Sequence, residues 1–273
     1  MRRQIILLLF IILILTSTFV FYACLKSESS LILATTTSTE QTGLLDAILP
    51  NFEKKTGIKV KVVAVGTGQA LEMGKNGEAD VLLVHAKASE EQFVADGYGI
   101  ERFDVMYNDF VLLGAEPLTD GGKDNIIAAF KQIDENKMLF VSRGDDSGTH
   151  KKELSIWKSA GIEPQGDWYI SAGKGMGEVI QMADELQAYT LSDRGTYLSM
   201  KDKIDLGVVV ENATELINPY GVIAVNPDLN PNIHHDEATQ FINWILSEET
   251  QTAIAEFGVE TYGQALFVPN AKE

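Results

Sequence analysis

The chain has 273 residues, a formal net charge of −17 at pH 7 and a single cysteine. So acidic a protein repels the phosphates of nucleic acids and of anionic membrane surfaces, and we therefore expect no nucleic-acid partner. A single cysteine excludes an intrachain disulfide. Beyond its first segment the chain keeps about 250 residues, which is enough for two domains or one large one.

The N-terminal segment is typical of a secretory signal. Arg2 and Arg3 precede an apolar stretch over residues 5–22, and a small residue stands before Cys24. We predict that residues 1–23 are a signal peptide of the lipoprotein type and that Cys24 carries a lipid anchor to the bacterial cell membrane. An uncleaved membrane anchor stays open as the alternative, because the stretch is just long enough to span a bilayer. Both interpretations place the remaining chain outside the cytoplasmic membrane, and cleavage would change the net charge from −17 to −19.

Two strands in the first part of the chain end in turns rich in hydroxyl groups and glycine. Residues 31–34 form an apolar run that continues into five consecutive hydroxyl residues, 35–39. One hydroxyl is needed to cap the following helix, and we expect at least one other to contact a ligand. The candidates are Thr36, Thr37 and Ser38. The strand at residues 59–65 ends in a similar turn, which adds Thr67 and Gly68 as candidates.

The histidines give weaker signals. A third strand, residues 79–84, ends at His85. A single histidine after an apolar run is more often a structural group than a ligand, so His85 ranks below the other candidates. His234 and His235 precede two acidic residues, but adjacent groups of this kind at a helix start indicate a cap and a solvated face. We therefore expect no metal cation and no cofactor.

The most informative stretch covers residues 142–150. It follows an apolar run at residues 138–141, which indicates a buried strand, and precedes a predicted helix over residues 151–160. The inner face of that helix is expected to carry Leu154, Trp157 and Ala160. The stretch is thus a tight turn from a strand into a helix.

This turn combines groups that bind anions. A helix start offers unpaired N–H groups and a partial positive charge. Ser147 and Thr149 add hydroxyl groups, and Arg143 adds a guanidinium fork whose geometry matches oxyanions. The sequence therefore predicts an oxyanion site at this turn.

Two long extended segments, residues 102–114 and 216–225, interrupt the alternation of strands and helices. The alternation predicts an α/β fold with a mostly parallel, doubly wound sheet. We expect the two segments to cross between two lobes. The first lobe would hold residues 31–110 and 218–273, and the second residues 111–217.

An enzyme is the remote alternative. Asp146, Ser147 and Gly148 are similar to the nucleophile sequence of serine proteases, with His85 upstream. Thr149 stands where such proteases carry glycine, however, and the Gly-x-Ser-x-Gly elbow of α/β hydrolases is absent. We expect a binding protein, with a secreted serine hydrolase using Ser147 as the less favoured reading.

The chain resembles the TupA-type tungstate-binding proteins of bacterial ABC transporters over residues 31–268. The matching segments are residues 34–39, 65–69, 80–86, 142–150 and 218–220. The resemblance implies a type II periplasmic-binding-protein fold, in which two α/β lobes joined by two crossovers hold the oxyanion between them. It also implies an extracytoplasmic protein that captures tungstate and delivers it to a transporter permease.

More distantly, the same turn resembles the Arg-x-Asp-x-Ser-Gly-Thr turn of phosphate-binding proteins. That resemblance implies four anion contacts, from Arg143, Ser147, Gly148 and Thr149. It implies that Asp145 holds Arg143. In the phosphate family another loop supplies a carboxylate for the proton of the ligand, whereas here the corresponding stretch ends in His85. This difference fits tungstate or molybdate, which carry no proton at neutral pH.

The choice among oxyanions stays open at this point. Tungstate and molybdate have nearly the same size and charge, so molybdate is the first alternative ligand and sulfate or phosphate the next. We expect the chain to act as a monomer whose partners are the oxyanion, a transporter permease and the membrane that its anchor enters.

Overall fold

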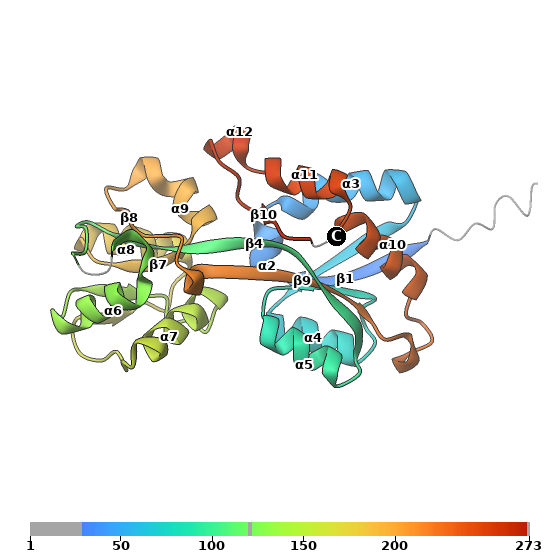
Figure 1. Ribbon diagram of the computed structural model, residues 1–273, viewed down its shortest axis with the longest axis horizontal. Coiled ribbons are helices and arrows are strands. Elements are labelled where there is room, and N and C mark those ends of the chain that lie inside the picture. Colours follow the sequence, from blue (N-terminus) through green and yellow to red (C-terminus); the bar gives the residue numbers. More distant parts are fainter. Residues whose placement is uncertain (1–28, 120–121, 272–273) are drawn as a thin grey trace, which may run out of the picture.

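The computed structural model describes residues 29–119 and 122–271, so the predicted signal peptide and Cys24 lie outside the described residues. Figure 1 shows two lobes side by side, with two long strands, β4 (Gly99–Gly114) and β9 (Ile217–Val225), running from one to the other. Within the two described ranges, no helix is both long enough and apolar enough to cross a membrane.

The first lobe is built on a mixed sheet. Its strands lie side by side in the order β10 (Val268–Pro269), β4, β9, β3 (Val81–Val84), β1 (Ser30–Thr36) and β2 (Lys59–Val65). Its helices are α2 (Thr37–Gln41), α3 (Leu44–Thr56), α4 (Thr67–Lys75), α5 (Lys87–Ala95), α10 (His235–Ile245), α11 (Glu248–Glu256) and α12 (Val259–Tyr262).

The prediction of a mostly parallel sheet is wrong in part. Strand β1 is parallel to β2 and β3, but β9 is antiparallel to β3 and to β4, and β10 is antiparallel to β4. The reason is that β9 carries the chain back from the second lobe. It therefore enters the sheet from the end at which β3 leaves it.

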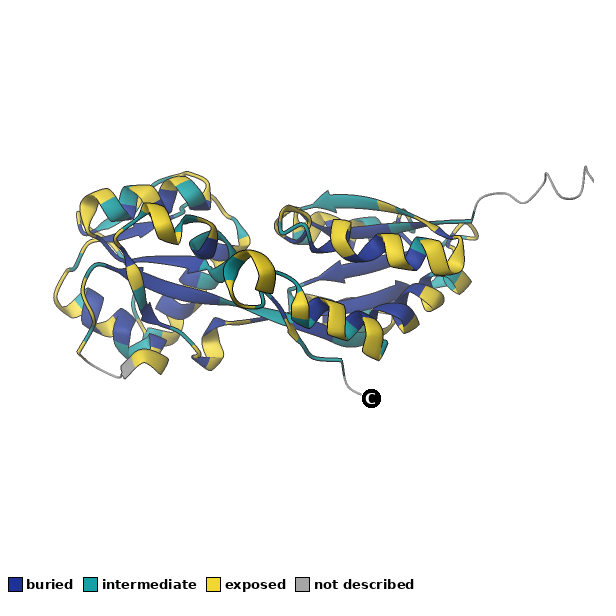
Figure 2. Cartoon of the chain, turned by 90° about the horizontal axis from the view of Figure 1, so that it is seen from above, coloured by how far each residue is buried: buried dark blue, intermediate teal, exposed yellow. Residues whose placement is uncertain are grey.

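Helices cover both faces of this sheet, as the doubly wound prediction requires. On one face α3, α10 and α11 bury Phe52, Phe241 and Ile254 against the strands. On the other face α4 and α5 bury Leu71 and Phe93. Figure 2 shows the result as buried strands between helices whose outer sides are exposed.

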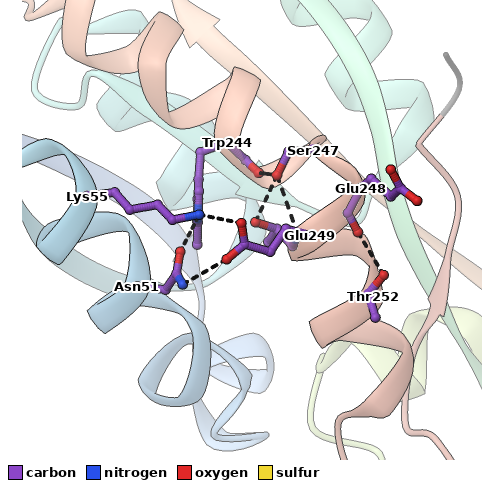
Figure 3. A network of polar contacts seen from close by, with 8 residues as sticks. Asn51, Lys55, Trp244, Ser247, Glu248, Glu249 and Thr252 are labelled. Carbon is purple, nitrogen blue, oxygen red and sulfur yellow. Dashed lines mark hydrogen bonds and ion pairs between the residues drawn. The ribbon is translucent and has the colours of Figure 1, made fainter.

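A polar network joins the C-terminal helices to α3 (Figure 3). The Glu249 carboxylate accepts from Asn51 Nδ2 at 3.1 Å and pairs with Lys55, while Trp244 Nε1 donates to Asn51 Oδ1 at 3.2 Å. Exposed ion pairs contribute little to stability. The network therefore aligns α11 on α3, whereas the buried aromatic side chains hold it there.

The second lobe uses the far end of β4. Residues Phe110 to Leu113 pair with β7 (Thr190–Asp193), and β8 (Gly207–Val210) also pairs with β4. A separate pair of parallel strands consists of β5 (Phe140–Ser142) and β6 (Tyr169–Ser171). The helices are α6 (Ile126–Glu135), α7 (Gly148–Ala160), α8 (Met176–Leu186) and α9 (Arg194–Met200). Short 3-10 turns lie at residues 122–124, 201–203 and 214–216, and one more follows β9 at residues 227–229 in the first lobe.

The inner face of α7 differs from the prediction. Leu154, expected inside, is 42% exposed, whereas Ile156 and Trp157 are buried. Glu153, a charged residue, shares the buried face. The hydrophobic pattern alone missed this register because a hydrogen-bonded carboxylate occupies one inward position.

Candidate functional site

The carboxyl ends of three parallel strands form one edge of the first lobe. Thr36 lies opposite Val65 in the pairing of β1 with β2, and Thr35 lies opposite Leu83 in the pairing of β1 with β3. The turns after β1, β2 and β3 therefore leave the sheet at the same edge. Ligands of open α/β sheets bind at such an edge.

His85 lies within hydrogen-bond distance of two hydroxyl groups at this edge. Its Nε2 lies 3.1 Å from Thr36 Oγ1 and 3.2 Å from Ser38 Oγ. Thr36 Oγ1 also lies 2.6 Å from Thr39 Oγ1 and accepts the backbone N–H of Thr39, so it caps α2. The result is a cluster of three hydroxyl residues, two of which, Thr36 and Ser38, lie against the imidazole.

The ring of His85 packs against a residue of β9. This residue is Tyr220, and the centroids of the two rings are 4.8 Å apart. Burial lowers the pKa of His85, a hydrogen bond with Asn218 opposes this shift, and the positive charge of Lys152 adds to it. The imidazole is therefore neutral at pH 7, so it can donate from one ring nitrogen and accept at the other.

The second lobe contributes the turn between β5 and α7. Arg143 Nη2 donates to Asp145 Oδ2 at 2.5 Å, and the backbone N–H of Ser147 donates to Asp145 Oδ1 at 3.2 Å. Ser147 Oγ accepts the N–H of His150 at 3.3 Å and so caps α7. Burial tends to raise the pKa of Asp145, but hydrogen bonds from Ser147 and Arg143 outweigh it and lower the pKa.

One donor of this turn lacks an acceptor. Arg143 Nε is buried and has no hydrogen-bond partner among the described residues. Buried donors are nearly always paired, and an unpaired one points to a missing acceptor. An oxyanion beside the guanidinium would supply that acceptor.

The two halves of the site meet at Gly148. A Cβ atom added at this first residue of α7 would lie 3.6 Å from His85 Cε1. The start of α7 in the second lobe therefore faces the hydroxyl cluster of the first lobe. Two segments more than 60 residues apart in the sequence therefore lie close together here.

The structure places the predicted residues unequally. Thr36, Ser38, His85 and Gly148 lie together, and Arg143, Asp145 and Ser147 are bonded to one another in the facing turn. Thr149 is buried in the first turn of α7, Thr37 is exposed at the start of α2, and Thr67 and Gly68 begin α4. In the described part of the chain, no hydrogen bond links these last four to the His85 cluster, and their ligand contacts stay predictions.

The chemistry of the site favours binding over catalysis. The helix starts, the hydroxyl groups and the guanidinium can all donate hydrogen bonds to a ligand, and the carboxylate of Asp145 already accepts from Arg143. His85 directs Nε2 toward Thr36 and Ser38, so it does not serve as a base for Ser147. The arrangement can hold a tetrahedral anion that carries no proton.

Sequence reasoning missed several residues around the site. Thr39 belongs to the hydroxyl cluster, and Tyr220 and Asn218 support His85. The family resemblance at residues 218–220 pointed to Asn218 and Tyr220, although it did not indicate what these residues do. Lys152 had no such signal, because nothing local distinguishes it from neighbouring lysines.

Two lobes whose hydrogen-bond donors face one another where the lobes meet indicate the class of protein to which this chain belongs. The sequence profile of the PBP superfamily domain matches residues 26–249. Fold and site together are those of a solute-binding protein of the periplasmic type.

Individual relatives narrow the class. The chain is 61% identical to the tungstate-binding protein TupA of Peptoclostridium acidaminophilum, over 90% of this chain and 87% of the relative. It is 43% identical to TupA of Campylobacter jejuni, over 86% and 89% of the two chains. The solved structure of TupA from Desulfovibrio alaskensis superposes with a TM-score of 0.81 at 45% identity, covering 89% of this chain and all of that one. The chain therefore belongs to the TupA family of the PBP superfamily.

Proposed function

We propose that this chain is the extracytoplasmic binding component of a tungstate ABC transporter. It holds the tungstate dianion between its lobes and delivers it to the permease. The observation that carries the proposal is the close approach of Gly148 to His85, which places donors of both lobes near one another. The relatives named tungstate-binding proteins support the choice of ligand.

The proposed ligand shell consists of donors only. Its members are Thr36, Thr37, Ser38, Thr67, Gly68, Arg143, Ser147, Gly148 and Thr149, with His85 as a further candidate. Nanomolar affinity corresponds to about 12 kcal/mol, and a hydrogen bond to a charged group contributes about 1.5–3 kcal/mol. Five or more contacts must therefore converge, which requires both lobes.

In this proposal β4 and β9 are the two crossovers. Lobe 1 comprises residues 31–110 and 218–273, and lobe 2 comprises residues 111–217. Each lobe has its own hydrophobic core, one set spanning β1, β3 and α10 and the other spanning α6, α7 and β7. Rigid lobes joined by two strands favour hinge closure over the anion.

The location follows from the first segment of the sequence. We propose that Cys24, once the signal peptide is removed, bears a lipid that keeps this monomeric protein at the outer side of the cytoplasmic membrane. A tethered binding protein stays close to its permease. Labelling of the wild-type chain with a radioactive fatty acid, lost in Cys24→Ala, is the direct measurement.

Calorimetric titration tests the ligand. The full-length chain, kept in solution with detergent, is titrated with tungstate, molybdate, sulfate and phosphate in turn. We expect tungstate to bind most tightly, and we expect Arg143→Gln to weaken it by about tenfold or more, because a charged hydrogen-bond donor is lost. Tight phosphate binding with tungstate inert would reject the assignment but leave the fold, whereas preference for molybdate would correct only the cargo.

A further inference from the structure

Lys152 is a half-buried cation held by neutral groups. Its Nζ donates to the backbone carbonyl oxygens of Glu215 at 2.9 Å and Ile217 at 3.0 Å, and it lies 5.7 Å from the centroid of the Phe110 ring. Among the residues that the structure describes, no carboxylate lies within 4.0 Å of this ammonium group. Carbonyl dipoles solvate the ammonium without cancelling its charge.

The position of Lys152 on α7 places this charge beside the anion site. Lys152 follows Gly148 by four residues, so the two side-chain positions lie on the same face of the helix. Gly148 is the residue that faces His85. Ile217, which accepts a hydrogen bond from Lys152, lies three residues before Tyr220, whose ring packs against His85. The charge of Lys152 also contributes to the lowered pKa of His85. The ammonium therefore lies where both lobes meet.

This placement is unfavourable for a lysine without an anion nearby. Burial lowers the pKa of Lys152, and attraction to the Glu215 carboxylate offsets only part of that effect. A cation in the first half of a helix is also repelled by the helix dipole. A negatively charged ligand at the start of α7 would offset both the burial of the Lys152 charge and its repulsion by the helix dipole.

The charge balance of the site calls for such a group. Arg143 is already paired with Asp145 at 2.5 Å, so these two residues together add little net charge. A bound dianion brings two negative charges, and a buried charge without compensation is costly. In the described ranges, Arg143 and Lys151 each pair with a carboxylate, whereas the charge of Lys152 is not compensated in this way.

We propose that Lys152 is a specificity-determining residue whose uncompensated charge makes the site prefer dianions to monoanions. The inference rests on the proposed function, namely that a tetrahedral oxyanion binds between the lobes. Lys152 acts through its electric field rather than by touching the ligand. Because Coulomb energy is proportional to ligand charge, its effect on a dianion is about twice that on a monoanion of the same shape.

Tungstate and perrhenate test this proposal because they are tetrahedral oxyanions of similar size. Tungstate carries two negative charges and perrhenate carries one. Calorimetry with the full-length chain in detergent compares the wild type with Lys152→Met. We expect tungstate affinity to fall about tenfold or more, and perrhenate affinity to fall by about half as much on a logarithmic scale. Lys152→Arg, which keeps the charge, is expected to retain most of the tungstate affinity.

Lys151 provides the matched control. It is the preceding residue of the same helix, but its side chain is 65% exposed and pairs with Asp146 at 3.3 Å. We expect Lys151→Met to leave both affinities unchanged. A loss of the same size in Lys151→Met and Lys152→Met would overturn the proposal.

If Lys152→Met lowered the affinities for tungstate and perrhenate by the same factor, Lys152 would have a structural role instead. If neither affinity fell, Lys152 would have no role in binding. If perrhenate binds too weakly to titrate, the salt dependence of tungstate binding decides. Between about 0.02 and 0.5 M NaCl, screening should reduce the affinity of the wild type more than that of Lys152→Met; equal salt dependence overturns the proposal. Failure of the proposed function would appear differently, as a wild-type chain that does not bind tungstate.

Discussion

At the scale of single residues, the site depends on a turn held in an uncommon backbone conformation. Gly144 and Asp146 both have φ near +60°, in the left-handed region. Aspartate tolerates this region better than most residues, and glycine occupies it without strain. A Cβ at Gly144 would also lie 1.9 Å from Ser171 Oγ and 3.1 Å from Ser171 Cβ. The turn therefore depends on the absence of a side chain at this position.

Gly144→Ala tests the requirement for glycine against a matched glycine. Gly173 has φ +63° but nothing within 4 Å of an added Cβ. We expect Gly173→Ala to reduce the free energy of unfolding by about 1 kcal/mol, from the backbone alone. Gly144→Ala adds a clash with Ser171, and we expect a total loss of about 2–4 kcal/mol. Urea denaturation followed by tryptophan fluorescence measures both, and equal losses would show that the close approach to Ser171 does not matter.

At the scale of the element, α7 is fixed by a buried carboxylate. Glu153 accepts hydrogen bonds from Ser142 Oγ at 2.7 Å, Tyr169 OH at 2.7 Å and Trp157 Nε1 at 3.1 Å. These donors belong to β5, β6 and α7 itself. The carboxylate therefore joins the strand before the turn at residues 143–147 to the helix after it. Such a network fixes one arrangement when every member is paired.

The pH dependence of stability reports on Glu153. Burial raises its pKa above the ordinary value of 4.5, although the three hydrogen bonds oppose the shift. Between those two pKa values the folded state binds more protons than the unfolded state, so stability falls as pH rises. We expect the unfolding free energy of the wild type, relative to Glu153→Gln, to decline above pH 4.5, by at most about 1.4 kcal/mol per pH unit.

Urea denaturation at intervals between pH 4 and pH 8 measures this difference. Glu163→Gln is a suitable control because Glu163 is exposed. Its difference from the wild type should stay nearly constant over the same range. A constant difference for Glu153→Gln as well would contradict the raised pKa.

At the scale of the whole molecule, two cores and two connecting strands suit a closing movement. The hydrophobic clusters of the two lobes share no residues, and β4 and β9 pair with each other between them. Packed cores deform little, so a movement between lobes is concentrated in the strands that connect them. An anion that bonds to both lobes favours the closed arrangement.

Solution scattering tests closure. We expect saturating tungstate to reduce the radius of gyration toward about 18 Å, the value for a compact chain of about 250 residues. Arg143→Gln, at a tungstate concentration below its own Kd, should show no such change. An unchanged radius in a wild-type sample that calorimetry shows to be saturated would rule out closure on binding.

The sequence by itself determined the local features of this protein. The order of strand, turn and helix at residues 138–160 was predicted correctly, because hydrophobic runs and helix starts depend on neighbouring residues. The strand lies at residues 140–142 rather than 138–141, and the helix begins at residue 148 rather than 151. Helices on both faces of the sheet followed from the alternation of elements. The contact of Asp145 with Arg143, implied by a family resemblance, is present as a hydrogen bond.

Only the tertiary structure decided which distant groups meet. The antiparallel entry of β9, the close approach of Gly148 to His85, and the carbonyl partners of Lys152 all involve segments far apart in the chain. The buried position of Glu153 depends on three donors from separate elements. No periodicity in the sequence encodes such pairings, because they arise from how two lobes pack and connect rather than from what each residue prefers locally.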